Sequence, residues 1–211
     1  MTRIYLVRHG ETAWNAQRRI QGSTDIPLND TGREQAAVTG RLLARREWDA
    51  IYSSPLSRAF ETASIIAREV GLPAPATRDA LMERAYGEAE GLDWEEVDRR
   101  FPGDDPVPGR ETREQVTDRV IPALIDLAEA HPGGDIIVVS HGGVIRSVLN
   151  EVDPGMEHGP ISNGSIHSIL HSDGTLELLV FNDPIDVLSL DCATGSIDEQ
   201  NALEGRDAVH S

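Results

Sequence analysis

Three short apolar runs divide the chain, and each of them ends in polar residues. They cover about residues 3–7, 49–53 and 136–139. Runs of this length that stop at Gly or Pro are typical of buried β-strands followed by turns. Helical patterns separate the three runs, so we expect parallel pairing with helices on both faces of the sheet. The pattern predicts an α/β fold, with three α/β/α layers and a mostly parallel central sheet.

Polar cap residues predict where the helices begin. Thr31 with Glu34, and Thr112 with Gln115, have the spacing of a capping box, and Ser57 is expected to cap a further helix. Pro122 should kink its helix or mark the true first turn. The expected helices cover about residues 31–46, 57–70, 94–101, 112–130 and 144–152.

The remaining segments divide the chain into a catalytic domain, a cap and a tail. Residues 1–182 form the predicted domain, and the Pro- and Gly-rich stretch 72–111 is interpreted as a short cap insertion covering the site. A C-terminal β-hairpin is expected around the turn at Asp173 and Gly174. The acidic residues 183–211 are predicted to be a weakly packed tail. The polar loop 10–30 is long enough to be functional or to contain a short helix.

Composition limits the class of protein. The chain of 211 residues is 39% hydrophobic and 26% charged, as expected of a globular protein, and no apolar stretch approaches the length of a membrane span. The N-terminus enters a strand almost at once, which argues against a signal peptide. The single cysteine, Cys192, excludes an intrachain disulfide and cysteine-rich metal sites. A cytoplasmic protein without a membrane partner is therefore expected.

The charged residues narrow the chemistry further. A net charge of −17 argues against a nucleic-acid partner, and all 19 basic residues other than histidine are arginines. Without lysine, Schiff-base catalysis and a P-loop are excluded. Any anion must be held by arginine, histidine, backbone N–H groups or a metal, and arginine suits bidentate contact with phosphate.

The strand ends bring the candidate chemistry together. The first strand runs into Arg8-His9-Gly10, and the third ends in the same way, in Ser140-His141-Gly142. The carboxyl ends of parallel strands meet in the crevice where α/β proteins bind ligands. Arg58 falls in the first turn of a helix that follows the second strand, where its charge opposes the helix dipole unless an anion binds there. Two histidines and two arginines in one pocket predict a site for a small anion.

Such a pocket suits phosphoryl transfer through a histidine. One imidazole would attack phosphorus, the cations would hold the phosphoryl oxygens, and a carboxylic acid would protonate the leaving oxygen. The candidate acids at the start of the cap are Glu83, Glu88 and Glu90. The residues alone leave open which of His9 and His141 is the nucleophile.

The separated motifs resemble the histidine phosphatase superfamily, in its phosphoglycerate-mutase-like branch. The resemblance covers about residues 3–182. It rests on motifs that occur in order along the chain, namely Arg8-His9-Gly10-Glu11-Thr12, Trp14-Asn15, Gln21-Gly22, Leu28-Asn29, Gly32, Ser53-Ser54-Pro55-Leu56-Ser57-Arg58-Ala59, Glu83-Arg84, Gly87, Gly91-Leu92 and Ser140-His141-Gly142-Gly143.

The resemblance implies a role for each matching residue. His9 corresponds to the nucleophile that forms phosphohistidine, and Glu83 to the acid/base. Arg8, Arg58 and His141 complete the phosphate pocket. Asn15, Gln21 and Gly22 match loop positions that contact phosphate or substrate. Neither a metal nor another cofactor is implied, and the remaining histidines are interpreted as structural or solvated: His131, His158, His167, His171 and His210.

The family contains both phosphatases and mutases. Mutase relatives resemble a longer chain, whose larger cap supplies lysine and additional arginines. Because this chain has no lysine and a short cap, we predict a phosphatase acting on a small phosphorylated metabolite, with a cofactor-dependent phosphoglycerate mutase as the alternative. A non-catalytic phospho-ligand binder is a second alternative, since a fold does not determine function. A homodimer is compatible with the sequence.

Overall fold

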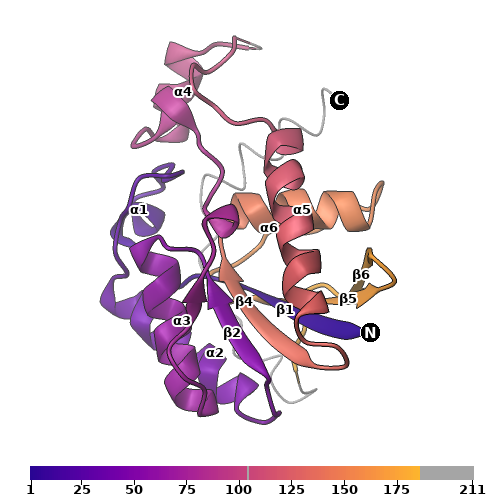
Figure 1. Ribbon diagram of the computed structural model, residues 1–211. Coiled ribbons are helices and arrows are strands. Elements are labelled where there is room, and N and C mark those ends of the chain that lie inside the picture. Colours follow the sequence, from indigo (N-terminus) through magenta and orange to yellow (C-terminus); the bar gives the residue numbers. More distant parts are fainter. Residues whose placement is uncertain (104, 186–211) are drawn as a thin grey trace.

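A six-stranded mixed sheet forms the centre of the protein in the computed structural model (Figure 1). The structure describes residues 1–103 and 105–185, so most of the expected acidic tail lies outside the described residues. The strands lie in the order β3-β2-β4-β1-β5-β6. Their bounds are β1 Thr2–Arg8, β2 Ala50–Ser53, β3 Ala76–Thr77, β4 Asp135–Ser140, β5 Ile166–Ser172 and β6 Thr175–Val180.

The central pairs of the sheet are parallel, as predicted. β4 pairs in parallel with both β1 and β2, while β5 and β6 form the expected antiparallel hairpin at one edge. At the other edge, the short strand β3 pairs in parallel with β2. β3 lies within the range expected as a cap insertion, so the first residues of that range form part of the sheet.

Helices cover both faces of the sheet, which confirms the three-layer prediction (Figure 1). The helices are α1 Ala13–Ala16, α2 Asp30–Leu43, α3 Ser57–Val70, α4 Trp94–Arg100, α5 Arg113–Glu129 and α6 Gly142–Val152, with short 3-10 helices η1 Asp79–Leu81 and η2 Gly87–Ala89. α1 is the short helix that was predicted as one possibility for the long polar loop 10–30. α4 lies in the cap, away from the sheet.

The alternation of β1 explains the two layers. Ile4 and Leu6 belong to the apolar cluster that includes α5 and α6, whereas Tyr5 and Val7 belong to the cluster with α2 and α3. Successive side chains of a strand point to opposite faces, so an uninterrupted apolar run is needed where both faces are covered. A smaller cluster joins the loop residue Ile20 to the cap.

Two helix starts differ from the prediction. α2 begins at Asp30 after Asn29, whose side chain accepts a hydrogen bond from the Gly32 amide, so the capping box expected at Thr31 is wrong. Ser57 is likewise wrong as a cap, because α3 begins at Ser57 itself. Its amide donates instead to the carboxylate of Asp25, 32 residues earlier in the chain.

The capping box at Thr112 and Gln115 is confirmed, and Pro122 lies inside α5.

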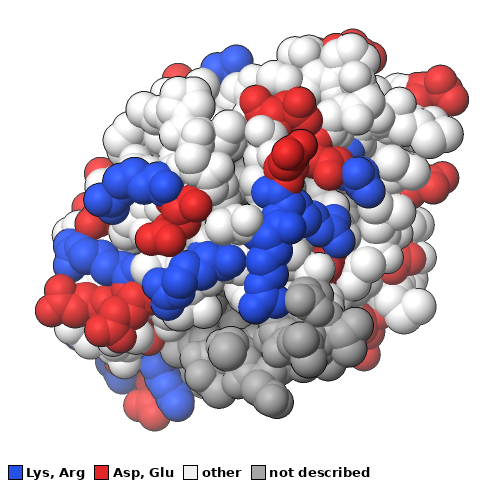
Figure 2. Space-filling model, turned by 90° about the horizontal axis from the view of Figure 1, so that it is seen from below, with Lys and Arg blue, Asp and Glu red and all other residues white. Residues whose placement is uncertain are grey.

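On the molecular face opposite the cap, described arginines lie beside carboxylates and do not form a continuous basic surface (Figure 2). Arg3 and Asp135 form an ion pair with an N–O distance of 2.6 Å. Within the described ranges, none of the helices is long and apolar enough to cross a membrane.

Candidate active site

The carboxyl ends of β1, β4 and β2 meet at one point of the sheet. Arg8 lies opposite Ser140 in the register of β1 and β4, and the His9 amide donates to the Ser140 carbonyl at 3.0 Å. The Ser54 amide, just after β2, donates to the Val139 carbonyl at 3.0 Å. These bonds bring the three polar segments predicted from the sequence together and place His9 and His141 side by side, with ring centroids 5.1 Å apart.

His9 is held in one tautomer. Its Nδ1 lies 2.7 Å from the Gly10 carbonyl oxygen. A carbonyl oxygen only accepts, so Nδ1 carries the hydrogen and Nε2 has the free electron pair. Burial lowers the pKa of His9 well below its usual value, and the positive charges of Arg58 and Arg8 act in the same direction. The ring is therefore neutral and nucleophilic at Nε2 near neutral pH.

His141 is equally buried but is held differently. It is the N-cap residue of α6 and makes no side-chain cap hydrogen bond. Neither of its ring nitrogens has a hydrogen-bond partner among the described residues. Burial lowers its pKa well below the usual value, with Arg58, His9 and Arg8 contributing. A protonated His141 is therefore disfavoured until an anion enters the pocket.

Two buried arginines supply the positive charge. Arg8 Nη1 donates to the Ile161 carbonyl at 2.6 Å, and Arg58 donates from Nη2 to Gly22 and from Nη1 to Thr24, at 2.7 and 2.8 Å. Burial lowers the pKa of Arg58 to about 10, while Glu83 opposes that shift, so the side chain stays charged at neutral pH. Arg58 Nε is buried without a partner in the described part of the chain.

Glu83 is the candidate acid that the structure brings to the histidines. It is 3% exposed, and its carboxylate accepts from the amides of Gly143 and Val144 at the start of α6, at 3.2 and 3.1 Å. A helix N-terminus favours negative charge, which explains how a carboxylate is tolerated at this depth. Because His141 immediately precedes α6, Glu83 lies on the same helix end as the second histidine.

The other two candidate acids are placed elsewhere. Glu88 is exposed. Glu90 accepts hydrogen bonds from five donors, the amides and hydroxyls of Ser23 and Thr24 and the amide of Tyr86. It therefore fastens the cap to the loop that holds Arg58. A side chain at Gly22 would meet the Glu90 carboxylate, since a Cβ there would lie 2.2 Å from Oε1.

The predicted loop residues line the same region. Asn15 and Gln21 are each 1% exposed, and both side-chain oxygens lie near the hydroxyl of Thr12, at 3.1 and 2.9 Å. These contacts leave the Gln21 amide nitrogen buried without a partner among the described residues. Gly22 contributes its carbonyl to Arg58. No pattern in the sequence indicates Asn163, whose side-chain amide donates to the His9 carbonyl at 2.9 Å across 154 residues of chain.

Two of the remaining histidines, His131 and His167, have ordinary structural partners. The Asn182 amide donates to His167 Nδ1 at 3.2 Å, and the His131 ring lies 2.8 Å from the Tyr52 hydroxyl. Burial lowers the pKa of His167 to about 3. Among residues 1–103 and 105–185, no cluster of three or more His, Cys, Asp or Glu side chains is arranged to hold a metal ion. His210 lies outside the described residues.

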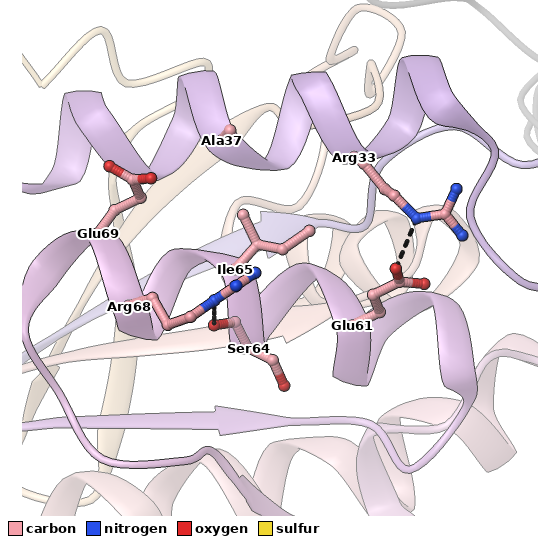
Figure 3. Close-up of a pocket in the computed structure, with 7 residues that line it drawn as sticks. All are labelled: Arg33, Ala37, Glu61, Ser64, Ile65, Arg68 and Glu69. Carbon is pink, nitrogen blue, oxygen red and sulfur yellow. Dashed lines mark hydrogen bonds and ion pairs between the residues drawn. The ribbon is translucent and has the colours of Figure 1, made fainter.

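A cavity of about 620 Å³ adjoins Glu83. Its lining comes from the cap, the first half of α5 and Ser23 of the loop before α2, and it includes Met82, Arg110 and Gln115. Sites for small metabolites commonly have volumes of a few hundred cubic ångströms. A second cavity, of about 380 Å³, lies between α2 and α3 (Figure 3). An ion pair between Arg33 and Glu61 bridges the two helices there, at 2.7 Å.

Comparison with known proteins identifies the family. A sequence profile of the histidine phosphatase superfamily (branch 1) matches residues 4–184. The chain is 42% identical over 172 residues to an uncharacterized phosphatase, PhoE, of Bacillus subtilis, covering 80% of this chain and 88% of that protein. It is also 42% identical over 163 residues to phosphoglycerate mutase-like protein 4 of Arabidopsis thaliana, covering 72% and 71%.

Solved structures agree with this assignment. A mycobacterial glucosyl-3-phosphoglycerate phosphatase in complex with VO3 superposes with a TM-score of 0.77 at 27% identity, covering 85% of this chain and 98% of that one. The fold, the separated motifs and the relatives named as phosphatases all agree. The chain belongs to the histidine phosphatase superfamily, whose members hydrolyse phosphomonoesters, and it is an enzyme of that class.

Proposed function

We propose that the protein is a metal-independent phosphatase that hydrolyses small phosphomonoesters through a phosphohistidine on His9. The observation that carries this proposal is a set of buried polar atoms that lack partners among the described residues: Arg58 Nε, Gln21 Nε2 and both ring nitrogens of His141. Buried polar groups are nearly always hydrogen-bonded, so such a group beside a neutral histidine calls for a ligand rich in acceptor oxygens. A phosphoryl group has that chemistry.

The first step forms the covalent intermediate. The Nε2 electron pair of His9 attacks phosphorus, and the bond from phosphorus to the ester oxygen breaks. The negative charge of the bound phosphoryl group favours the protonated form of Glu83, and that proton passes to the leaving oxygen, which departs as an alcohol. Arg8 and Arg58 stabilise the negative charge on the phosphoryl oxygens, and the same charge raises the affinity of His141 for a proton.

The second step returns the enzyme to its starting state. Water attacks phosphorus, the bond to His9 Nε2 breaks, and Glu83 accepts a proton from the water as it attacks. The cavity of about 620 Å³ beside Glu83 offers room for the alcohol portion of the substrate and for water. A small phosphorylated metabolite is the proposed substrate, in a cytoplasmic setting.

A cofactor-dependent phosphoglycerate mutase is the alternative, favoured by the similarity to a mutase-like plant protein. A mutase has to retain the phosphoenzyme and hold the acid group of its substrate while the molecule reorients. The absence of lysine and the short cap support the phosphatase instead. A non-catalytic phospho-ligand binder would have no need of a nucleophile held in one tautomer.

Trapping the intermediate tests the proposal. Protein quenched in alkali during turnover of a ³²P-labelled phosphomonoester should carry acid-labile label, and His9→Ala should carry none. Turnover without labelling of the wild-type protein would contradict the phosphohistidine, and no turnover of any phosphoester would favour the binder. Interconversion of 3- and 2-phosphoglycerate in the presence of 2,3-bisphosphoglycerate, with little phosphate released, would identify a mutase.

A further inference from the structure

An ion pair between Glu111 and Arg119 lies behind the candidate acid. Arg119 is on α5, and Glu111 lies just before the cap residue of that helix. The pair is bidentate, with Nε to Oε1 at 2.7 Å and Nη2 to Oε2 at 2.9 Å. Its side chains are only 26% and 19% exposed, so solvent screens them less than an ordinary surface pair.

Arg119 also forms hydrogen bonds with the backbone segment that contains Glu83. Its Nη1 donates to the carbonyls of Ala80 and Met82 at 2.6 and 2.9 Å, and Nη2 donates to the Glu83 carbonyl at 3.4 Å. With the two bonds to Glu111, all five N–H groups of the guanidinium are occupied. Arg119 therefore has no donor left for a substrate, although it lines the cavity beside Glu83.

Glu111 holds the same segment from the other side of Glu83. Its Oε2 accepts from the Ala85 amide at 3.1 Å, and its own amide donates to the Ala85 carbonyl at 2.8 Å. Its carbonyl accepts from Arg84 Nε at 2.7 Å. Burial alone would raise the pKa of Glu111, but hydrogen bonding and charge from Arg119 lower the pKa below its usual value. The pair consequently stays ionised across the neutral range.

The side-chain carboxylate of Glu83 contacts the N-terminus of α6. Its carboxylate accepts from the first amides of that helix, and α6 packs against α5 in one apolar cluster that includes Val120 and Val144. We propose that Glu111 and Arg119 form a positioning pair that fixes the backbone of Glu83 so that its carboxyl group reaches the leaving oxygen. This inference rests on the proposed role of Glu83 as the general acid.

Leaving-group dependence separates positioning from general stability. An alkyl phosphate such as glycerol 2-phosphate needs its leaving oxygen protonated, whereas p-nitrophenyl phosphate releases a stable anion. Glu111→Gln and Arg119→Lys should each lower kcat for the alkyl ester about tenfold to a hundredfold, as expected of a misplaced catalytic group. The kcat for the aryl ester should fall by less than about threefold, and KM should stay nearly constant for both.

A matched control is available in the pair between Arg33 and Glu61, which joins α2 to α3 with the same N–O distance of 2.7 Å (Figure 3). Glu61→Gln should leave the ratio of the two kcat values unchanged. In a Glu83→Gln background, adding Glu111→Gln should not change that ratio any further, because the group being positioned is no longer an acid.

Two results would overturn the inference. Equal losses on both esters would mean that the pair only stabilises the fold, and a rise in KM with constant kcat would mean that it binds substrate directly. Arg119→Lys provides a second test if Glu111→Gln does not fold, and melting temperatures identify that case. Failure of the proposed function is distinguishable, since the wild-type protein would then hydrolyse neither ester.

Discussion

Two adjacent strands end in the same His-Gly pair, yet the structure treats the two ends differently. After His9 the chain enters a loop, and the Gly10 carbonyl fixes the hydrogen on Nδ1. After His141 the chain turns directly into α6, and neither ring nitrogen has a partner among the described residues. An anchored ring presents one nitrogen for attack, while an unanchored ring beside a helix N-terminus is suited to bind an anion. The proposed difference between nucleophile and anion ligand therefore follows from the backbone after each histidine.

The largest expected effect is the loss of His9. His9→Ala removes the attacking nitrogen, and by analogy with other covalent catalysts kcat should fall by about 10⁵-fold or more. Steady-state hydrolysis of p-nitrophenyl phosphate measures the effect. A residual rate within about a hundredfold of the wild-type rate would mean that water attacks phosphorus directly.

Removing His141 should have a smaller effect of a different kind. His141→Asn deletes one group that stabilises the phosphoryl oxygens, a change that commonly costs about 10²- to 10³-fold in kcat. The variant should still form labelled phosphoenzyme, more slowly, in a rapid-quench experiment. If His141→Asn abolished labelling and His9→Ala retained it, the two roles would be reversed.

The glycines that follow the two histidines, Gly10 and Gly142, differ in how closely they are packed. A Cβ at Gly10 would lie 2.2 Å from the Gly32 carbonyl oxygen, whereas at Gly142 its nearest neighbour would be Arg8 Nε at 3.4 Å. Gly10→Ala should therefore lower the free energy of unfolding by about 1–3 kcal/mol or more, as overpacking does. Gly142→Ala should change it by less than about 1 kcal/mol. Urea denaturation measures both, and equal losses would contradict the close approach at Gly10.

The smallest effect concerns stability in acid. Both histidines have a folded-state pKa well below the usual value of 6.5, so below that pH the unfolded chain binds protons that the folded protein excludes. Each should make the free energy of unfolding fall by about 1.4 kcal/mol per pH unit as the pH drops below 6.5. His141→Asn should flatten that slope by the same amount.

Inorganic phosphate provides the control for the acid-stability measurement. An anion in the pocket favours protonated His141, so saturating phosphate should flatten the wild-type slope and leave the slope of His141→Asn much less affected. A wild-type slope that is unchanged by His141→Asn would mean that this ring is already protonated in the empty pocket.

Local patterns predicted the features that depend on local structure. The apolar runs identified β1, β2 and β4, and their polar ends identified His9, Arg58 and His141. The prediction that Ser57 caps a helix was wrong. The Ser57 amide donates to the distant Asp25 carboxylate, and no sequence pattern near Ser57 indicates that contact. Glu83 was one of three equivalent carboxylates until the family resemblance selected it.

Contacts between distant segments account for what the sequence did not reveal. Asn163 and Arg119 reach their partners only after the sheet and α5 are in place. The apolar period along α5 predicts which side is buried, but it does not indicate that a charged residue on that helix will bond the carbonyls of another loop. The roles of the site residues remain predictions.

The attachment of the cap at Glu90 has a consequence for motion. Four donors would lose their acceptor together if the cap lifted away from residues 23 and 24, namely the amides and hydroxyls of Ser23 and Thr24. At about 1 kcal/mol net for each bond, the lifted state would be populated by about one molecule in a thousand. Because the Thr24 carbonyl also accepts from Arg58 Nη1, the same attachment links the cap to a buried arginine of the site.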